Sequence, residues 1–533
     1  MKALRMNKQD RLETIIAIAI LIGFICISIP RLHLPHFWDA SWVYGPAIYD
    51  MSRGIPSLLP DSLDVRIARG HPLMFHFLGA SWVKIFGYSA ISLNVFTLCI
   101  SLAALFMVYR LGSRFFGAGA GLIALAICAT QEMFVAQALQ TLPEMLLALC
   151  VLTTMYTYLT ERNLLFVISG VVLLLTKETG VVAIGTISLL HLMKVIFITE
   201  PEKRLKEFWR GTLFIALPVL IASSHYIYQK VVYGWFFFPE HVESQIWDPI
   251  PILFRLRDVF DLIFMWQGRI VITLLTLVAL CIWIGRRAFY RGAALMLALL
   301  IMHQLFYEGH NQPVWSRFVI PSIIFICIVL FALIPYLKKN PKSGLAANGL
   351  VMYLSMFMGF TAINLLTSRY VLNGVVIYAL ICGWILSRFV IRKWMVFGFI
   401  ALPMAVFIYQ LAQPRYVRDI NLTYADGVKM YQGLTEYFAN DTIRPCTVMG
   451  TLLEAVAMGD PRAGYVDKPV DSVTVVIQRD TATLIEGSVD YLINSNVLEY
   501  VTLPKSAPDC CELVHEISIG DARAEIYRVH KRK

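Results

Sequence analysis

The apolar residues of this chain fall into long runs that short polar segments separate. An α-helix needs roughly 20 such residues to cross about 30 Å of hydrocarbon, and the runs predict about 13 transmembrane helices, the fifth of them short. These helices are expected at residues 14–30, 90–109, 115–135, 143–160, 164–176, 180–198, 212–230, 266–285, 292–308, 316–336, 347–367, 371–387 and 394–411. The first run has a basic flank but no small-residue cleavage site, so we expect it to remain as an anchor.

From about Gln413 onward, short apolar runs alternate with helix-like segments. This pattern predicts a small α/β domain with buried strands. The expected strands are Cys446–Gly450, Val473–Ile477, Tyr491–Ile493, Leu513–Ile519 and Ala524–Val529, the last two joined by a turn at Gly520-Asp521, and the expected helices are Gly427–Phe438 and Leu452–Met458. The chain is thus expected to divide into a membrane domain, residues 1–411, and a soluble α/β domain, residues 412–533. The soluble part contains no GxGxxG or GxxxxGK[ST] motif, so we expect it to cover a site or bind an acceptor.

Composition narrows the class of protein. Apolar residues make up 58% and charged residues 15% of the 533 residues, and the mean hydropathy is +0.65. Soluble domains are nearer one half apolar and one quarter charged, so these figures argue against a soluble enzyme and exclude a disordered chain, a collagen-like repeat and a disulfide scaffold. The net charge of +10 comes from the membrane part, whereas the tail is mildly acidic. Membrane lipid is an expected partner and nucleic acid is not.

The distribution of charge predicts the orientation in the membrane. With the N-terminus inside, every short basic cluster falls in an inner loop, as the positive-inside rule requires. Most carboxylates then lie outside with the C-terminal domain, which gives an N-in, C-out topology. Two outer loops, residues 31–87 and 231–265, are much longer than a helix connection needs. Long loops on one face favour an enzyme or receptor site there, and two plain amphipathic surface loops are the alternative.

The cysteines indicate little about function. Most of the 10 cysteines lie in the apolar runs and are expected to be small core residues. Cys446, Cys510 and Cys511 lie in the outer domain, where a disulfide is allowed, but three cysteines leave one over. No CxxC motif and no His/Cys spacing indicates a metal site.

Asp39 is the first candidate for chemistry. It follows His36-Phe37-Trp38, directly beyond the first apolar run. A carboxylate held against aromatic rings at the membrane surface is partly desolvated and can act as a base or orient a substrate. A helix N-cap is an equally good explanation, because Asp before Ala-Ser-Trp suits that position.

Further charged groups lie near the ends of the next apolar runs. Arg66, Arg69 and His71 could hold a phosphate, and contact of snorkelling side chains with lipid headgroups is the alternative. Glu144 begins the fourth run, directly after Pro143. Both residues are favourable at a helix N-terminus, so Glu144 is either a structural cap or a functional carboxylate.

Ionisable residues also interrupt the apolar runs later in the chain. Lys177 and Glu178 lie between two runs, where charges are costly and indicate a site, and a self-paired Lys–Glu at a helix break is the alternative. Arg269 flanks the second long loop, Arg317 begins the tenth run, and Arg369 lies in a short outer loop. Carboxylates thus occur early in the chain and isolated arginines later. This distribution is suited to an anionic lipid substrate, which arginines can bind, together with a carboxylate base.

The ordered set of these segments resembles the GT-C glycosyltransferases of the protein O-mannosyltransferase and lipid A aminoarabinose transferase type. The resemblance covers about residues 30–325, and the thirteen-span layout with a small outer domain agrees with it. The segments that carry it are Trp38-Asp39, His71-Pro-Leu-Met-Phe-His-Phe-Leu, Trp82-Val-Lys-Ile-Phe-Gly87, Glu144, Leu175-Thr176-Lys177 and Arg317-Phe-Val-Ile-Pro321. The chain differs from the usual pattern at Ala40, where Glu is usual, at Glu144, where Asp is common, and at Glu178-Thr179, where Gly-Pro is common.

The resemblance implies transfer of a sugar from a polyprenyl-phosphate donor to a protein, lipid A or cell-surface glycan on the outer face, with inversion at the anomeric carbon. Asp39 is implied as the base and Glu144 as an assisting carboxylate. The implied ligands of the donor phosphate are Lys177, Arg317, Arg66, Arg69, Arg269 and Arg369, and those of the acceptor or sugar are Trp38, His71 and Glu178. Because fixed cations can stabilise the departing phosphate, no cofactor is expected to be required. A divalent metal is compatible with this chemistry but is not predicted.

Two alternative functions remain from the sequence. A transporter or flippase of a lipid-linked sugar would show internal repeats and ionisable residues near the bilayer midplane, and a family member that has lost catalysis is the other alternative. No clear repeat relates the two halves of the membrane part, and most charges lie near the ends of the apolar runs. We expect a bacterial inner-membrane protein, since no large lumenal module is recognised.

Overall fold

The computed structural model describes residues 8–284, 340–364, 367–390, 394–439, 445–477, 489–497 and 511–530. The predicted spans 292–308 and 316–336 lie outside these residues, as do the candidate Arg317 and Cys510.

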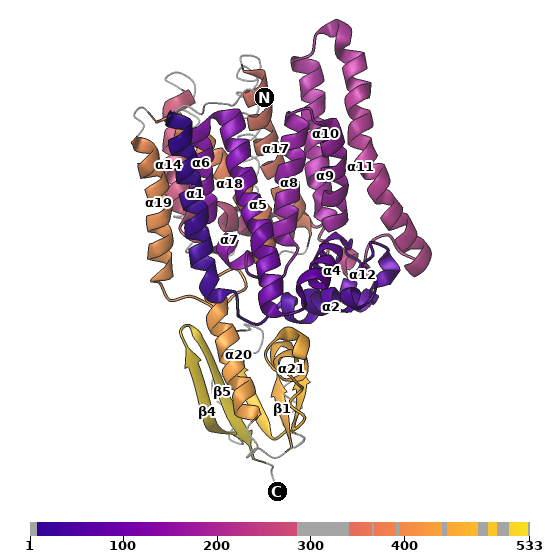
Figure 1. Ribbon diagram of the computed structural model, residues 1–533, viewed down its shortest axis with the longest axis vertical. Coiled ribbons are helices and arrows are strands. Elements are labelled where there is room, and N and C mark those ends of the chain that lie inside the picture. The colour runs from indigo at the N-terminus through magenta and orange to yellow at the C-terminus, as the bar shows by residue number, and fades with distance from the viewer. Residues whose placement is uncertain are drawn as a thin grey trace.

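Helices form most of the described structure, and a small sheet lies near the C-terminus (Figure 1). The helices of the membrane part are α1 (Lys8–Ser28), α2 (Gly45–Arg53), α3 (Val65–Ala68), α4 (Met74–Phe86), α5 (Ala90–Phe116), α6 (Ala118–Ala129), α7 (Glu132–Gln137), α8 (Glu144–Leu159), α9 (Asn163–Thr176), α10 (Val181–Phe197), α11 (Arg204–Tyr233), α12 (Pro239–Glu243), α13 (Pro249–Phe260), α14 (Arg269–Ile284), α17 (Pro341–Ile363), α18 (Leu372–Ser387) and α19 (Met395–Leu411). The predicted helical membrane fold with a small C-terminal sheet is therefore confirmed in outline.

Six helices of the described residues are long and apolar enough to cross a membrane, or up to seven if one bent pair counts as a single span. Four shorter apolar helices, α6, α8, α9 and α19, coincide with further predicted runs. The protein is thus a multi-pass membrane protein, and the number thirteen stays a prediction. The bent pair joins residues 249–265 to residues 269–280 at 83°. Part of the predicted loop 231–265 is therefore an apolar helix that begins at Pro249. The sequence did not predict this helix because the charges of Arg255 and Arg257 interrupt its apolar run.

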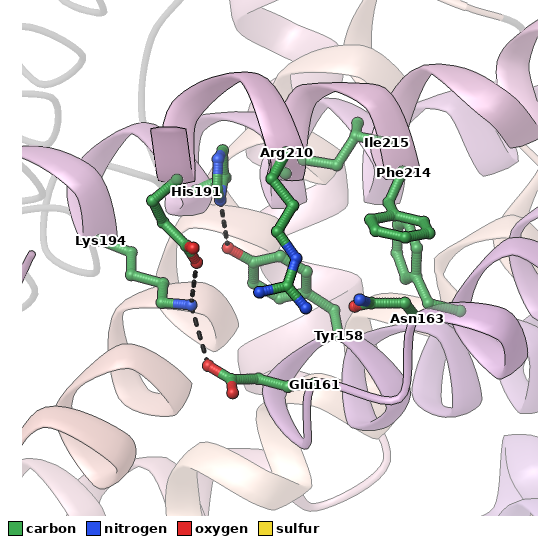
Figure 2. Close-up of a pocket in the computed structure, with 11 residues that line it drawn as sticks. Tyr158, Glu161, Asn163, His191, Lys194, Arg210, Phe214 and Ile215 are labelled. Carbon is green, nitrogen blue, oxygen red and sulfur yellow. Dashed lines mark hydrogen bonds and ion pairs between the residues drawn. The ribbon is translucent and has the colours of Figure 1, made fainter. Parts of the chain in front are cut away.

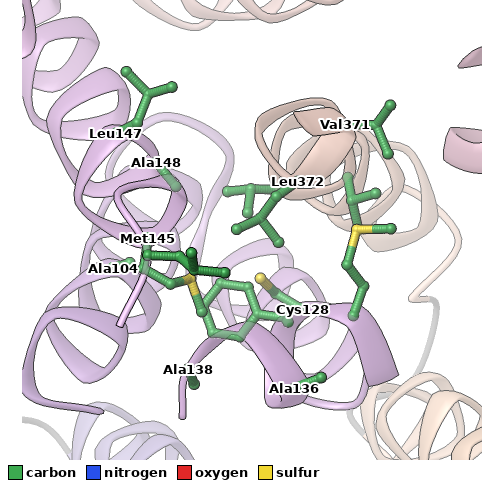
Figure 3. Packing of buried hydrophobic residues seen from close by; sticks show 14 of the residues in the cluster. Ala104, Cys128, Ala136, Ala138, Met145, Leu147, Ala148, Val371 and Leu372 are labelled. Carbon is green, nitrogen blue, oxygen red and sulfur yellow. The ribbon is translucent and has the colours of Figure 1, made fainter. Parts of the chain in front are cut away.

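Small residues allow close helix packing in the centre of the bundle. A Cβ atom on Gly383 of α18 would lie 2.6 Å from the Ala120 carbonyl oxygen of α6. Gly112 of α5 and Gly121 of α6 face each other in the same way, since a Cβ on Gly112 would lie 2.8 Å from the Gly121 Cα. Side chains of α6, α8 and α18 then fill the space between the helices (Figure 3). The small residues that the sequence offers for helix packing are thus used within one chain.

The C-terminal sheet has five strands in the order β2-β1-β3-β5-β4. Its elements are α20 (Tyr424–Phe438), β1 (Cys446–Gly450), α21 (Leu452–Gly459), β2 (Val473–Ile477), β3 (Tyr491–Ser495), β4 (Cys511–Ile519) and β5 (Ala522–Val529). Strand β1 pairs in parallel with β2 and β3, whereas β5 pairs antiparallel with β3 and β4. The predicted strands and the hairpin turn at Gly520-Asp521 are confirmed. Cys446 is free, and strands β3 and β5 separate its strand β1 from strand β4, which begins at Cys511.

The bundle has two distinct ends. The end that faces the sheet, which we call the sheet end, also carries α2, α4 and α12 of the two long predicted loops (Figure 1). The hairpin turn between α10 and α11, with its basic residues, lies at the opposite or far end (Figure 1). Both long loops and the sheet thus share one end, as the charge pattern predicts, while the side of the membrane stays a prediction.

The C-terminal domain is attached to the first loop by polar contacts. The Tyr88 hydroxyl donates to the Arg462 carbonyl at 2.7 Å, and the His36 amide donates to the Ala463 carbonyl at 2.9 Å. The Arg462 guanidinium also lies 3.2 Å from the Asp50 carboxylate. These contacts place the domain directly over the residues that follow the first span.

Candidate functional site

A buried arginine gathers three carboxylates at the sheet end of the bundle. Arg369, which precedes α18, pairs with Asp39, with Asp419 at 2.9 Å and with Glu144 at 3.5 Å. Lys177, which follows α9, donates to the same Glu144 oxygen at 3.0 Å. We call these five residues the Arg369 cluster. Its members come from five separate segments of the chain, and ion pairs of this kind in a multi-pass protein indicate a functional site.

The backbone around Asp39 is unusual. Trp38 has φ +55, in the left-handed region that bulky residues rarely adopt, and a single π-helical turn over Ala40–Tyr44 follows Asp39. The Asp39 side chain makes no capping hydrogen bond to that turn and instead accepts one from Arg369. The N-cap explanation of Asp39 is therefore wrong in this structure. Left-handed backbone and π-helical turns both concentrate at functional sites.

Glu144 and Lys177 lie at facing helix ends. Glu144 is the first residue of α8 and is 2% exposed, and its Oε1 accepts from Lys177 while Oε2 has no hydrogen-bond partner among the described residues. The chain breaks at Lys177 between α9 and a single 3-10 turn, Glu178–Gly180. The Lys177 ammonium lies 3.8 Å from the centre of the Tyr370 ring, a cation–π contact. The alternative explanation, a self-paired Lys177 and Glu178, is wrong in this structure, because Lys177 pairs with Glu144 and Glu178 pairs with His71.

Asp419 is the member of the cluster that sequence reasoning missed. It lies in the segment that joins α19 to α20, and the side chains of Gln137 and Gln140 both donate to its backbone carbonyl, at 2.8 and 2.5 Å. Burial raises the pKa of the Asp419 carboxyl, an effect that Arg369 opposes. No motif marks this residue, and its one signal in the sequence is an acid placed shortly after the last predicted span.

The charges of the cluster do not cancel. Asp39, Glu144 and Asp419 supply three carboxylates, whereas Lys177 and Arg369 supply two cations. The Arg369 and Glu144 side chains are 3% and 2% exposed, and those of Asp39 and Asp419 are 17% and 14% exposed. The cluster is thus more accessible to solvent from the side of Asp39 and Asp419 than from the side of Glu144.

Other predicted phosphate ligands lie apart from the cluster. Arg66 is exposed and pairs with Asp64 at 2.8 Å. Arg269 is fully buried, donates to the Gln131 side chain at 2.7 Å and to the Leu262 carbonyl at 2.5 Å, and thereby holds the bend between α13 and α14. Arg69 is exposed with φ +48, and Arg317 lies outside the described residues. Their role as phosphate ligands stays a prediction.

The residues predicted for the acceptor or sugar pocket also separate into two places. Trp38 precedes Asp39 and packs on Trp42, with ring centres 5.9 Å apart. His71 and Glu178 lie together, with the His71 Nδ1 3.1 Å from both carboxylate oxygens of Glu178. They are linked to the cluster through Lys177, the neighbour of Glu178 in the chain.

A separate hollow of about 60 Å³ lies at the far end among α8, α9, α10 and α11. Figure 2 shows Lys194 directed at Glu161, and Tyr158 beside His191. Lys194 also pairs with Glu207 at 2.8 Å. None of the predicted site residues lines this hollow, and its charges connect the turn between α8 and α9 to the hairpin of α10 and α11. We therefore assign it to structure rather than to the predicted chemistry.

Comparison with known proteins gives one family. Residues 70–228 match the family model described as dolichyl-phosphate-mannose-protein mannosyltransferase, and no curated protein sequence matches the chain. Among solved structures, the chain is similar to ArnT from Cupriavidus metallidurans bound to undecaprenyl phosphate, with 12% identity, a TM-score of 0.49 and 97% of both chains covered. It is also similar to the oligosaccharyltransferase AglB from Archaeoglobus fulgidus in complex with an inhibitory peptide and a dolichol-phosphate, with 11% identity, a TM-score of 0.47, and 90% of this chain and 69% of that chain covered.

The family match confirms the resemblance that the ordered motifs predict. The matched segment contains Glu144, Lys177, His71 and Glu178, whereas Asp39, Arg369 and Asp419 lie outside it. The apolar helices indicate a multi-pass membrane protein, and residues 70–228 are similar to a glycosyltransferase family. The sugar, the acceptor and the roles of individual residues are not given by the match.

Proposed function

We propose that the protein transfers a sugar from a polyprenyl-phosphate donor to an acceptor at the sheet end of the bundle. The observation that carries this proposal is the Arg369 cluster, in which Asp39, Glu144 and Lys177 meet although more than 30 residues separate each from the next. The family match supports the donor class, because the family is described by a dolichyl-phosphate-linked mannose donor and a protein acceptor. For this chain, the acceptor is a protein, lipid A or a cell-surface glycan.

In the proposed reaction Asp39 is the base. It accepts the proton of an acceptor hydroxyl or amine, and the freed lone pair attacks the anomeric carbon from the face opposite the phosphate. The bond between that carbon and the phosphate oxygen breaks, the electron pair leaves with the polyprenyl phosphate, and the configuration at the anomeric carbon inverts. General base catalysis of this kind contributes about 10² to 10⁴-fold in rate.

The two cations of the cluster act on the leaving group. Negative charge grows on the phosphate oxygens as the bond breaks, and fixed cations stabilise such charge most when they are held in place beforehand. Lys177 and Arg369 are held by carboxylates, so the phosphate shares or replaces those partners when it binds. The Oε2 of Glu144, which has no hydrogen-bond partner in the described parts of the chain, is available to a hydroxyl or amine of the acceptor. This step needs no resident cofactor.

The donor also fits the position of the site. The isoprenoid tail of the donor lies in lipid between the helices, and its phosphate lies at the level of the helix ends where α8, α9 and α18 meet. We place the sheet end on the outer side of a bacterial inner membrane, in accordance with the positive-inside prediction.

The experiment compares Asp39→Asn with wild type on a panel of polyprenyl-phosphate sugars and candidate acceptors, and measures release of free polyprenyl phosphate. We expect turnover of one donor and a loss of at least about 100-fold in Asp39→Asn. The matched control is Asp64→Asn, an exposed carboxylate of the same loop, which should keep the wild-type rate. Equal turnover in Asp39→Asn would remove Asp39 as the base, and no turnover of any donor by folded protein would favour the transporter or the inactive relative.

A further inference from the structure

Three arginines line a hollow at the far end of the bundle, remote from the Arg369 cluster. Arg110 and Arg114 come from the last turns of α5, and Arg162 comes from the turn between α8 and α9. The hollow has a volume of about 530 Å³. The rest of its lining carries hydroxyl groups, from Ser113, Tyr156 and Thr160. We call it the Arg162 hollow.

The three guanidinium groups of the hollow lack an anionic partner. Within the described parts of the chain, none of these side chains forms an ion pair or a hydrogen bond. Other cations at the same end are satisfied. Lys194 pairs with Glu161 at 2.9 Å and with Glu207 at 2.8 Å, and the Arg204 guanidinium donates to the Ile196 carbonyl at 3.0 Å. The arginines of the hollow are therefore an exception among the charges around them.

The backbone separates Arg162 from the acid that precedes it in the chain. Glu161 has φ +57, in the left-handed region that residues other than glycine rarely adopt. Its carboxylate accepts from Lys194 and lines the other hollow of this end, whereas Arg162 lines the hollow described here. The charge of Arg162 is therefore not neutralised by its neighbour, and the turn that keeps the two apart is strained.

We propose that the Arg162 hollow binds a phosphate group, and that its surroundings favour the headgroup of an anionic phospholipid. Guanidinium groups offer paired donors that match two phosphate oxygens at once. The Ser113 hydroxyl, which is buried without a hydrogen-bond partner among the described residues, is a further donor. The C-termini of α5 and α8 bring partial negative charges of about half a unit each, so roughly two of the three positive charges remain for a bound anion.

The surface beside the hollow is suited to an acyl chain. Phe106 lies four residues before Arg110, on the same face of α5, and is 49% exposed. It therefore lies one turn from the hollow toward the middle of the apolar span Ala90–Phe116. In the orientation that the basic loops predict, the far end faces the inner leaflet, where anionic lipids attract arginine side chains. A phospholipid with its phosphate among the arginines thus has an apolar surface for its chain.

A bound phosphate joins α5 to the hairpin formed by α8 and α9. The turn of this hairpin carries Arg162, whereas its other end carries Glu144 and Lys177 of the Arg369 cluster. Helix α8 has 16 residues, so the two ends of the hairpin are roughly 24 Å apart. The hollow thus holds the hairpin at the end remote from the candidate site, and the proposal does not depend on the sugar-transfer reaction.

The test applies native mass spectrometry to the full-length protein in detergent with added phosphatidylglycerol, and counts the lipid molecules retained. We expect one retained molecule in wild type, and binding weakened by at least about 10-fold in the double variant Arg114→Gln, Arg162→Gln, since each arginine near an anionic surface contributes about 5-fold. The matched control is Lys203→Gln with Lys206→Gln, which removes two exposed cations of the same end outside the hollow. This control should bind the lipid as wild type does.

Inorganic phosphate, added in excess, distinguishes the two sources of a phosphate group. Lipid that stays bound supports a phospholipid headgroup, and lipid that is displaced supports a free phosphate in the same hollow. Equal retention by wild type and the arginine double variant would overturn the proposal, and so would wild-type protein that binds neither probe. Equal losses in both double variants would also overturn it, because they would indicate diffuse attraction to the basic end.

The unfolding temperature guards against variants that fail to fold. Without lipid, the arginine double variant should unfold at the wild-type temperature, because both of its changed side chains are exposed and unpaired among the described residues. Added phosphatidylglycerol should raise the unfolding temperature of wild type and of the lysine control, since a ligand that binds the folded state stabilises it. An equal rise in the arginine double variant would contradict a site at the Arg162 hollow.

Discussion

Arg369 is the residue on which the candidate site depends most. Its guanidinium is almost fully buried and contacts the carboxylates of Asp39, Asp419 and Glu144. A planar guanidinium offers donors in several fixed directions, so one arginine can hold groups from three segments at once. The same feature makes the arrangement sensitive to the loss of that one side chain.

We predict that Arg369→Gln destabilises the protein strongly. The change leaves buried carboxylates without a cation, which costs about 3 to 5 kcal/mol, and the unfolding temperature in detergent should fall by several degrees. Arg369→Lys keeps the charge but lacks the planar fork and should have a smaller effect. Arg66→Gln, at an exposed ion pair, is the control and should leave the unfolding temperature unchanged. An Arg369→Gln protein that unfolds at the wild-type temperature would contradict the role of Arg369.

His36 predicts a pH dependence of stability. Both of its ring nitrogens are buried without a hydrogen-bond partner among the described residues, and burial lowers its pKa from 6.5 to about 4. The folded protein keeps this imidazole neutral while the unfolded chain binds a proton below pH 6.5, so stability is lost as the pH falls from 6.5 to about 4, by roughly 3 kcal/mol. The unfolding temperature of His36→Gln should fall less over this range than that of wild type. The control is His33→Gln, at an exposed histidine nearby, which should follow the wild-type curve.

At the scale of elements, the contact between α6 and α18 depends on the absence of side chains. Gly383 brings the two helices so close that a Cβ atom would overlap the Ala120 carbonyl oxygen and approach the Ala124 Cβ to 2.8 Å. Interiors packed at this density do not absorb an added methyl group without strain. Since Arg369 lies just before α18, the position of this helix also sets the position of the site.

We therefore predict that Gly383→Ala destabilises the protein by about 1 to 3 kcal/mol. Gly398→Ala is the matched control, because Gly398 also lies within a helix, α19, but has no atom within 4 Å of an added Cβ. Alanine is the better helix former, so the control should unfold at the wild-type temperature or slightly above it. Equal unfolding temperatures for the two variants would show that α6 and α18 pack less closely than described here.

The elements could be predicted from the sequence far better than the contacts between them. Apolar runs place the helices and short β-branched runs place the strands, because both patterns are local. The break at Lys177 is also visible as charge between apolar runs. The choice of partners is not local, since Lys177 pairs with Glu144 rather than with Glu178, and Asp419 reaches Arg369 through a segment without any motif. The hydrogen bonds of Arg269 to Gln131 and Leu262 across the bend are likewise not visible in the sequence.

At the scale of the whole molecule, the C-terminal part contributes a residue to the Arg369 cluster, because Asp419 pairs with Arg369. The segment before α20 is fixed to α7 by Glu132, which is 2% exposed and accepts from the Arg415 guanidinium and, at 2.8 Å, from the Leu422 amide. Between these two anchors lies Asp419. The membrane part and the C-terminal domain are therefore coupled through the site itself.

We predict that Glu132→Gln loosens this segment. The Arg415 charge loses its partner, which corresponds to about 1 to 3 kcal/mol, so cleavage by trypsin at Arg415 and Arg418 should become about 10-fold faster and the proposed sugar transfer should slow. The control is Glu436→Gln, at an exposed carboxylate of α20, which should be cleaved at the wild-type rate. Unchanged cleavage in Glu132→Gln would show that Glu132 does not hold the segment.

The dispersal of the cluster along the chain has a consequence for biosynthesis. Glu144 and Lys177 are separated by 33 residues, so they can pair as soon as α8 and α9 have inserted. The ribosome adds 330 residues after Asp39 before Arg369 is synthesised, and 50 further residues before Asp419 is synthesised. Ionisable groups are costly in lipid without a partner, so the nascent chain has to keep Asp39 at the hydrated edge of the bilayer until late in translation. The site is thus among the last parts of the membrane domain to assemble. In a chain that ends before residue 419, Arg369 lacks the carboxylate of Asp419.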